Sequence, residues 1–430
     1  MLRILYDILL HAAFVVTLPY FTYKAFTAGK YRQGIKERFG FISEKKLGAL
    51  RNSRFVWMHA VSVGETRAVL PLLKLFKERH PEFKILFSTV TMTGNAVAKT
   101  EGAAIIDVLI YYPFDFFWVI SRVLGKARPE AFIVAEKEIW PNMIAALKCR
   151  NIPIMVINGS ISERSFKRYK FFGFFLRRAF ESLSLFSAQT GLDAQRAIEL
   201  GAPQKNTFAT GNIKFDMKPK AANRAREEEI MRSLGIAAGD IVLTAGSTHP
   251  GEEKLILQAH ETLKREFPEL KLIIAPRHPE RFSEVASLLS AGKIPFARRS
   301  RGVGSEKPSI SLLDTLGELG IVYSFSTIAF VGGSLVNIGG HNLLEPAFFS
   351  RPVIFGPYVK SYKQMAEELA GSGGGFLVNT IDDLIAIAGQ LLRDKALYDK
   401  AGKAAHDFVV ANSGTATKTL DLMDKLINGK

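Results

Sequence analysis

The chain has 430 residues, which exceeds what one hydrophobic core usually holds, so we expect two domains of about 200 residues each. Its formal net charge of +16 favours acidic partners, namely nucleic acid, anionic lipid headgroups or phosphorylated small molecules. The single cysteine, Cys149, excludes an internal disulfide and provides no thiolate cluster for a metal ion.

The first predicted element is a membrane anchor over residues 1–26. Residues 2–26 are largely apolar and approach the ~20 residues that a bilayer core requires, without the cleavage site of a signal peptide. The polar interruptions are Arg3, Asp7, His11 and Lys24. The basic residues at the end of the run and just beyond it are Lys24, Lys30, Arg32, Lys36 and Arg38. By the positive-inside tendency they keep the following chain cytoplasmic. We expect this helix to span once or to lie in the interface; a buried core helix is the alternative.

From Phe55 onward, apolar strand-like runs alternate with segments of helix length, which is the βαβ pattern of parallel α/β domains. A second series of this kind begins near Asp240. The charged stretch 211–229 has little apolar periodicity and is predicted to connect the domains. The predicted boundaries are 27–210 for the first domain, 211–229 for the connection, 230–405 for the second domain and 406–430 for a C-terminal helix. This last helix is predicted to pack back on the first domain.

The stretch HAVSVGETRAVLPLL, residues 59–73, is typical of a strand end followed by a helix with Gly64 and Glu65 in its first turn. Ser62 to Glu65 spell S-x-x-E, a capping box, in which the two side chains bond backbone amides at the helix start. A carboxylate at the carboxyl edge of a strand also faces the crevice where open α/β sheets bind ligands, and a neighbouring glycine lets a substrate approach. This stretch alone favours a cap, with a catalytic acid as the alternative.

Residues 163–180, ERSFKRYKFFGFFLRRAF, interleave six Lys or Arg with seven aromatic residues. Stretches of this kind bind single-stranded nucleic acid by stacking. Beside a membrane anchor they favour contact with a membrane surface instead. A helix that packs into the core with one solvated face is the alternative. We expect no nucleic-acid partner.

In the second domain, AGSTHPGEE (245–253) and APRHPER (275–281) follow predicted strands. The amides and hydroxyls of residues 246–248 precede a helix and are expected to cradle an anion. Arg277 stands at a strand end, where a guanidinium grips phosphate through two parallel hydrogen bonds. A solvated surface charge is the alternative for Arg277.

A glycine-rich loop lies within residues 330–357. Glycine pairs at 332–333 and 339–340 lead into a helix that is predicted to begin near Leu343, with Glu345 in its first turn. Glycines that run into a helix N-terminus predict a phosphate site. Glu345 then either hydrogen bonds the ribose hydroxyls of a nucleotide or serves only the helix dipole. The loop is not a dinucleotide fingerprint, because G-x-G-x-x-G is absent.

Seven motifs occur in order along the chain: HAVSVGE, EKEIWPN, GNIKFD, GSTHPGEE, PRHPER, DTLGEL and FVGGSLVNIGGHNLLE. On these motifs, across nearly its whole length, the sequence closely resembles the 3-deoxy-D-manno-octulosonic acid (Kdo) transferases of lipopolysaccharide biosynthesis. The resemblance implies an α/β fold of the GT-B type, with two doubly wound Rossmann-like domains facing a central cleft. It also implies an inverting glycosyltransferase that forms no covalent intermediate.

The resemblance places the family's catalytic base on Glu65 and its transition-state stabilisers on Glu136 and Lys214. The implied CMP contacts are Pro276, Arg277, Leu316, Gly317, Glu318, Asn342, Leu343, Leu344 and Glu345. Two residues depart from the family pattern. Leu316 replaces a common Met, which keeps an apolar contact, and Lys137 replaces a common Thr, which adds a cation beside Glu136.

The resemblance further implies CMP-Kdo as the donor and a lipid A precursor, lipid IVA, as the acceptor. It places the enzyme on the cytoplasmic face of the cell inner membrane, in contact with the membrane lipids. No cofactor and no metal are expected. Glu136 and Glu138 offer two carboxylates on one side of a strand, but Lys137 adds a positive charge there and no D-x-D sequence occurs. No single motif sets the number of Kdo units transferred.

Two alternatives remain. A related GT-B enzyme that uses a UDP-sugar, either a transferase or an epimerase, shares this domain plan, and competition by CMP against UDP distinguishes it. A non-catalytic protein that binds anionic lipid explains the charge and the anchor, but leaves the acid and the glycine loop without a role.

Overall fold

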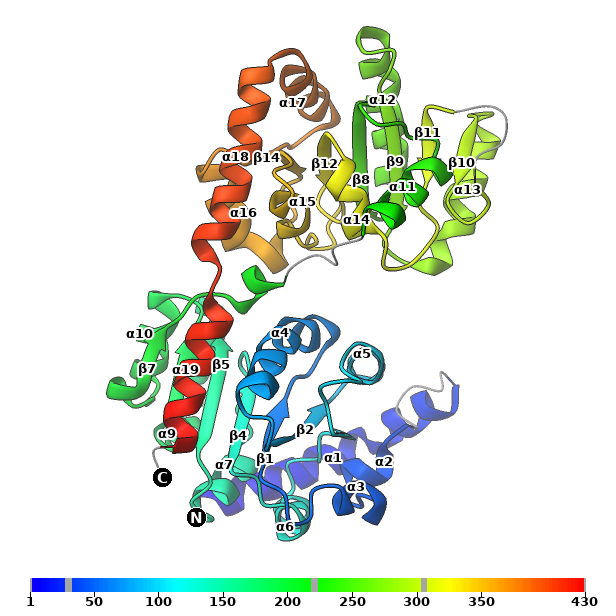
Figure 1. Ribbon diagram of the computed structural model, residues 1–430. Helices are drawn as coiled ribbons and strands as arrows, with labels where there is room; N and C mark the ends of the chain where they lie inside the picture. The colour runs from blue at the N-terminus through cyan, green and yellow to red at the C-terminus, as the bar shows by residue number, and fades with distance from the viewer. Residues whose placement is uncertain (1, 28–32, 218–222, 303–307, 429–430) are drawn as a thin grey trace. The chain divides into compact units, whose positions relative to one another are not determined.

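The computed structural model describes residues 2–27, 33–217, 223–302 and 308–428. The chain divides into two compact units, the first formed by Met1–Met217 with Asn412–Lys430 and the second by Lys218–Ala411. Each unit is built around one seven-stranded parallel sheet with helices packed against it (Figure 1). The prediction of two α/β domains with parallel sheets is confirmed.

The first sheet is buried on both faces. In spatial order its strands are β3 (Val108–Tyr111), β2 (Lys84–Thr89), β1 (Phe55–His59), β4 (Ala131–Ala135), β5 (Ile154–Gly159), β6 (Leu185–Ala188) and β7 (Thr207–Ala209). Every residue of β1, β4, β5 and β6 is buried. Helices cover both faces of such a sheet, which explains the unbroken apolar runs in the sequence. The strand order reverses between β1 and β4, so their carboxyl ends form the switch point where α/β sheets bind ligands.

The helices of the first unit begin largely at residues that the sequence marks as caps. Ser62, Thr91, Ser162 and Thr190 each accept a backbone N–H from the first turn of the helix that follows. These helices and short 3₁₀ turns are α2 (Ile35–Arg38), α3 (Glu44–Gly48), α4 (Val63–Arg79), α5 (Met92–Glu101), α6 (Phe117–Lys126), α7 (Pro141–Lys148), α8 (Glu163–Phe171), α9 (Gly173–Glu181), α10 (Gly191–Glu199), η1 (Gln204–Asn206) and η2 (Ile213–Asp216).

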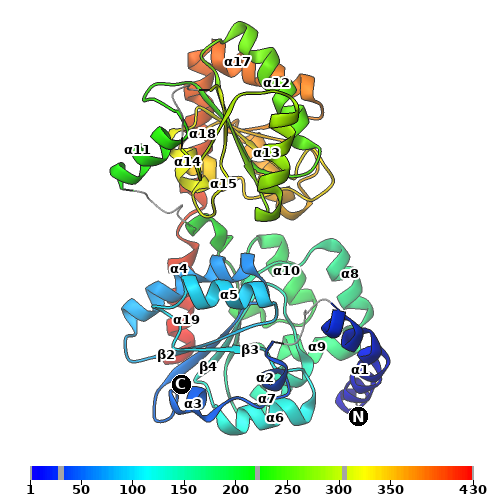
Figure 2. The ribbon, with the colours of Figure 1, turned by 90° about the vertical axis from the view of Figure 1, so that its right-hand side faces the viewer.

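The predicted anchor corresponds to helix α1 (Leu2–Thr27), which lies against α7 and α9 (Figure 2). Polar residues of α1 make contacts with the unit: the Tyr6 hydroxyl donates to Asp115 at 3.0 Å, and Asp7 accepts from the Asn142 amide at 2.8 Å. Phe14 packs against neighbouring aromatic rings. Another face of α1 exposes large apolar side chains, namely Ile4, Leu5, Ile8, Leu9, Val15 and Val16. The helix is therefore amphipathic and is not a buried core helix.

None of the helices within the described ranges is both long and apolar enough to cross a membrane. Two of the basic residues in the predicted flank, Lys30 and Arg32, lie outside the described residues, and so does the side chain of Lys24.

The second sheet repeats the parallel arrangement. In spatial order its strands are β10 (Phe296–Arg298), β11 (Ile310–Leu312), β9 (Lys271–Pro276), β8 (Val242–Thr248), β12 (Ile328–Val331), β13 (Val353–Phe355) and β14 (Gly375–Leu377). Its helices and turns are α11 (Arg224–Ser233), α12 (Glu252–Glu266), η3 (Pro279–Arg281), α13 (Phe282–Ala291), α14 (Leu319–Phe325), α15 (Leu344–Phe348), η4 (Lys360–Tyr362), α16 (Lys363–Gly371), α17 (Ile381–Arg393) and α18 (Lys395–Asn412). The switch point of this sheet lies between β8 and β12.

The stretch predicted to connect the domains, residues 211–229, is divided between the units. Its start forms η2 in the first unit, where Ile213 is buried, and its end begins α11 in the second. Residues 218–222 lie outside the described ranges. The first unit therefore extends to Met217, beyond the predicted end at residue 210.

The C-terminal helix α19 (Thr415–Asn428) packs against α4 and η2 of the first unit (Figure 1). Leu420 and Met423 of α19 join the hydrophobic core beneath the sheet. The Asp216 carboxylate accepts the backbone N–H groups of Gly414 and Ala416, both at 2.6 Å. These bonds satisfy amide groups at the start of α19 and fix it to η2.

Candidate active site

The first candidate residue, Glu65, lies in the first turn of α4, directly after the carboxyl end of β1. Its carboxylate accepts the Val61 N–H at 2.7 Å and the Ser62 hydroxyl at 3.0 Å, while the Ser62 side chain accepts the Glu65 N–H at 3.4 Å. The cap suggested by the sequence is therefore present. The cap holds the Glu65 carboxylate at the switch point, so the carboxylate does not point into solvent.

The protonation of Glu65 is unusual for a carboxyl group. Burial, and then the nearby negative charge of Glu136, raise the pKa of Glu65 from 4.5 to about 7, although the bonds from Val61 and Ser62 oppose this rise. A carboxyl group with a pKa near neutrality exchanges a proton readily at physiological pH. Glu65 thus has the chemistry of a general base in addition to its place in the cap.

Glu136 follows β4, the neighbour of β1 at the switch point, so the sheet brings the two acids together. Its backbone has a φ of 60°, in the left-handed region that non-glycine residues rarely adopt. The Glu136 N–H donates to Ile157 O at 2.8 Å, and its carboxylate lies 3.3 Å from the Lys214 ammonium. Strained backbone of this kind is characteristic of functional sites, where the surrounding structure holds it.

Asn158 positions Lys214, and the sequence analysis did not identify this residue. It is the second-last residue of strand β5 and has a φ of 53°, and its side-chain oxygen accepts the Ile213 N–H at 3.0 Å. Ile213 and Lys214 are neighbours in η2, so Asn158 and the Asp216 bonds to α19 fix the turn that carries the lysine. The Asn-Gly pair at the end of β5 was the signal available in the sequence.

The additional cation Lys137 is exposed. Burial raises the pKa of Glu138, and the charge of Lys137 opposes this rise. Glu136 forms its ion pair with Lys214 rather than with Lys137. In the part of the chain that the structure describes, no group of three or more His, Cys, Asp or Glu side chains is arranged to hold a metal ion.

The glycine-rich loop of the second unit uses the amides of its first residues within the protein, and the phosphate site at the helix start that follows stays a prediction. The amides of Gly333, Ser334 and Leu335 donate to the buried carboxylate of Glu252 at 2.8 to 3.1 Å, as does the amide of His249 at 2.9 Å. The amides of Gly339 and Gly340 donate to Gly333 O. An internal anion already occupies this nest of N–H groups, so these amides serve the loop rather than a ligand.

Residues 246–248, predicted as an anion cradle, belong to strand β8. Gly246 and Thr248 pair with β9, whereas Ser247 lies at a shift of the register with a φ of 57°, so the cradle stays a prediction. The helix that follows, α12, begins only at Glu252, and a glycine at position 332 is needed because a Cβ there would lie 2.9 Å from the Glu252 carboxylate.

Three basic side chains gather at the carboxyl ends of β8 and β9 and at the loop after β12. The Nε2 atoms of His249 and His341 lie 2.8 Å apart, so one imidazole donates and the other accepts. Burial, and then the charge of Arg277, lower the pKa of His341 to about 3. Arg277 itself is exposed at the end of β9 and follows Pro276 as predicted. The side chains of His249 and His341 were not recognised from the sequence.

The other predicted CMP contacts differ in what they can offer a ligand. Leu316 is 70% exposed, and Gly317 has a φ of 80° that favours glycine. The Glu318 carboxylate is already bonded by Arg226, Arg299 and Thr315.

The remaining predicted contacts surround the start of α15, which begins at Leu344 with Glu345 in its first turn, as expected. Asn342 caps this turn by accepting the Leu344 N–H at 3.1 Å. Leu343 and Leu344 are buried in the core, so only their backbone groups are available to a ligand.

The two α/β units and the paired acids at the first switch point define an enzyme of the GT-B-like class. The fold resembles UDP-GlcNAc 2-epimerase from Neisseria meningitidis, with a TM-score of 0.60, 14% identity, and coverage of 86% of this chain and 100% of the epimerase. The family model described as 3-deoxy-D-manno-octulosonic-acid transferase (kdotransferase) matches residues 33–217.

The curated relatives carry the same description. The 3-deoxy-D-manno-octulosonic acid transferase of Haemophilus influenzae is 36% identical over 92% of this chain and 91% of its own length. That of Chlamydia pneumoniae is 32% identical over 96% of this chain and 94% of its own length. The chain belongs to the Kdo transferase family and is a glycosyltransferase.

Proposed function

We propose that the protein transfers Kdo from CMP-Kdo to a lipid A precursor, lipid IVA, in lipopolysaccharide synthesis. The observation that carries the proposal is Glu65, a half-buried carboxyl group with a pKa of about 7 beside Glu136 at a switch point. Family membership supports Kdo as the sugar, and the relatives, which are Kdo transferases, support the reaction type.

In the proposed reaction, Glu65 in its ionised form takes the proton of an acceptor hydroxyl. The freed oxygen forms a bond to the anomeric carbon of Kdo as the bond from that carbon to the CMP phosphate oxygen breaks. The electron pair leaves with CMP, which departs as a phosphate monoester, and the proton stays on Glu65. A single displacement of this kind inverts the anomeric configuration and needs no covalent intermediate.

Lys214 and Glu136 have complementary proposed roles. An ammonium group stabilises the negative charge that develops on a leaving phosphate. The carboxylate of Glu136 holds Lys214 at 3.3 Å before the donor binds, and it favours positive charge on an oxocarbenium-like centre. We assign CMP binding to Arg277 and to the loops that carry Leu316 to Glu318 and Asn342 to Glu345. In this proposal these groups balance the negative charge of the donor phosphate, so no divalent metal is needed.

We also place the enzyme on the cytoplasmic face of the inner membrane, with α1 lying in the interface. The exposed apolar face of α1 supports this placement, and so do the exposed rings of Phe171, Phe172 and Phe174. Amphipathic helices bury such faces at the headgroup boundary. Removal of residues 1–22 is expected to shift the protein partly from the membrane fraction to the supernatant.

The test of the transfer mechanism is Glu65→Gln, assayed with purified CMP-Kdo and lipid IVA by mass spectrometry of the lipid product. Loss of a general base reduces a rate by about 10² to 10⁴-fold, whereas CMP binding by calorimetry should be unchanged. The matched control is Glu78→Gln on the exposed side of the same helix, which should transfer Kdo normally. Turnover of Glu65→Gln at the wild-type rate would leave Glu65 only its role as a cap.

A further inference from the structure

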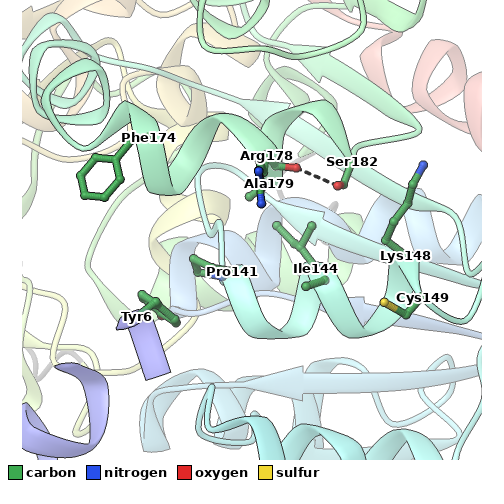
Figure 3. A pocket seen from close by; sticks show the side chains of 10 residues that line it. Tyr6, Pro141, Ile144, Lys148, Cys149, Phe174, Arg178, Ala179 and Ser182 are labelled. Carbon is green, nitrogen blue, oxygen red and sulfur yellow. Dashed lines mark hydrogen bonds between the residues drawn. The ribbon is translucent and has the colours of Figure 1, made fainter. Parts of the chain in front are cut away.

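A groove runs between helices α7 and α9 of the first unit, and Tyr6 of α1 lines one end of it (Figure 3). Its volume is about 240 Å³. The lining residues are Tyr6, Pro141, Ile144, Ala145, Lys148, Cys149, Phe174, Arg178, Ala179 and Ser182. It is separate from the acids at the switch point, none of which line it.

The two ends of the groove differ in chemistry. Phe174, Tyr6 and Pro141 lie toward one end, and Lys148, Cys149 and Ser182 lie toward the other (Figure 3). Between them the floor is formed by Ile144 and small alanine side chains. The groove is therefore apolar at the end with Phe174 and Tyr6, and it becomes basic from Arg178 in its middle to Lys148 at the other end, a gradient that matches an amphiphile.

The charge of the groove has one sign. Its lining contains two cations, Lys148 and Arg178, and no acid. Neighbouring cations are neutralised, since Lys170 pairs with Glu199 and Arg177 with Glu181. Among the described residues no carboxylate forms an ion pair with Lys148 or Arg178. An anionic group bound in the groove would be attracted by both cations, and none of the lining residues is acidic.

Tyr6 is held in place at its end of the groove, and exposed apolar side chains lie near it on α1. The Tyr6 hydroxyl donates to the buried Asp115, which also accepts the first amides of α7 from Asn142 and Met143. On α1, the neighbours of Tyr6 in sequence include the exposed side chains of Leu5 and Ile8. A chain leaving the groove at this end therefore reaches the apolar face that we place in the membrane.

We propose that this groove binds one anionic glycerophospholipid of the membrane, with its phosphate at the end that carries Lys148 and an acyl chain along α7. From Pro141 to Cys149 the helix rises roughly 12 Å, enough for about ten methylene groups in extended form. The charge of the lining selects an anionic headgroup over a zwitterionic one. The site holds the first unit at the bilayer by a specific lipid, in addition to the non-specific attraction of the basic surface.

The test measures lipid retention by the full-length protein in detergent, without donor or acceptor. Native mass spectrometry after exposure to equal amounts of phosphatidylglycerol and phosphatidylcholine should detect one retained phosphatidylglycerol, preferred roughly tenfold or more. Lys148→Ala combined with Arg178→Ala should abolish the preference. Arg164→Ala combined with Lys167→Ala removes the same charge from α8, outside the groove, and should keep it. Equal retention of both lipids, or equal loss in both double variants, overturns the proposal.

A second measurement locates the lipid in the groove. Cys149 is exposed, lines the groove and is the sole cysteine of the chain, so its rate of alkylation reports occupancy. Phosphatidylglycerol should slow alkylation in the wild type and in the α8 control variant, but not in the groove variant.

Filling the groove by Ala145→Leu leaves both cations in place and should abolish retention, while circular dichroism verifies the fold. Protection of Cys149 by lipid IVA but not by phosphatidylglycerol would overturn the proposal, because the groove would then belong to the acceptor. Kdo transfer is measured separately, so failure of the groove proposal leaves the proposed reaction standing.

Discussion

Replacing Glu65 by Gln should make the first unit more stable at alkaline pH while it removes transfer. In the folded protein, burial and the charge of Glu136 raise the pKa of this carboxyl from 4.5 to about 7. Below pH 4.5 the group is protonated in both the folded and the unfolded chain. Between pH 4.5 and 7 the unfolded chain releases the proton and the folded chain retains it, so the free energy of unfolding falls as the pH rises.

The size of this effect follows from the two pKa values. Their difference of 2.5 corresponds to about 3 kcal/mol of lost stability, fully developed above pH 7. The glutamine variant carries no titrating group at this position. Its amide oxygen can accept the Val61 N–H and its amide nitrogen can donate to Ser62, so the bonds of the cap are retained. The stabilisation by Glu65→Gln should therefore approach 3 kcal/mol at pH 8 and be small at pH 5.

Urea unfolding followed by tryptophan fluorescence measures this difference in the first unit alone. All three tryptophans of the chain, Trp57, Trp118 and Trp140, belong to that unit. The variant Glu78→Gln, which changes an exposed acid on the same helix, is the matched control and should show no comparable dependence on pH. If Glu65→Gln gave the same change in unfolding free energy at pH 5 and pH 8, the carboxyl would be ionised at its ordinary pKa and the argument for a base near neutrality would fail.

Four further outcomes are expected. Arg277→Ala should weaken CMP binding in calorimetry without lowering the melting temperature, and unchanged affinity would remove this residue from the donor site. Asp216→Ala should lower the melting temperature and the transfer rate together, since loss of a cap costs about 1 kcal/mol, whereas Asp216→Asn, which keeps one acceptor oxygen, should restore each only in part. Glu252→Gln should destabilise the second unit by about 3 kcal/mol in urea unfolding, because an amide presents N–H groups to amide donors. Transfer with purified donor should survive EDTA, and a loss that Mg²⁺ restores would contradict the proposed charge balance.

Local patterns in the sequence were sufficient to predict the helices and strands, but not the contacts between them. The apolar runs predicted the parallel strands, and Ser62 with Glu65 predicted the start of α4, because strand period and helix caps are properties of neighbouring residues. The switch point then brings Glu65 beside Glu136 through the order of the strands. That order is a tertiary property, and only the family resemblance connected the two acids beforehand.

The glycine loop marks the limit of such patterns. Glycines before a helix predicted that their amide groups would be free to bind a phosphate. Instead, the carboxylate of Glu252, which stands 81 residues before Gly333, accepts hydrogen bonds from amides of this loop. Local sequence does not reveal a partner at that separation. The polar interruptions of α1 are a similar case: Asp7 weakened the pattern of a membrane helix, and its carboxylate bonds Asn142 on α7. Asp7 is out of place in an apolar helix, and its hydrogen bond to Asn142 explains why it is there. The sequence alone does not identify that partner.

The return of α19 to the first unit has a consequence for biosynthesis. Its buried side chains Leu420 and Met423 complete a core whose strands were translated more than 200 residues earlier. During synthesis, part of the apolar surface of the first sheet therefore stays uncovered. It remains so until the second unit has been made and α19 has left the ribosome. A premature stop that removed α19 would leave the sequence of the second unit intact. The damage would fall on the turn that holds Lys214, about 200 residues before the stop.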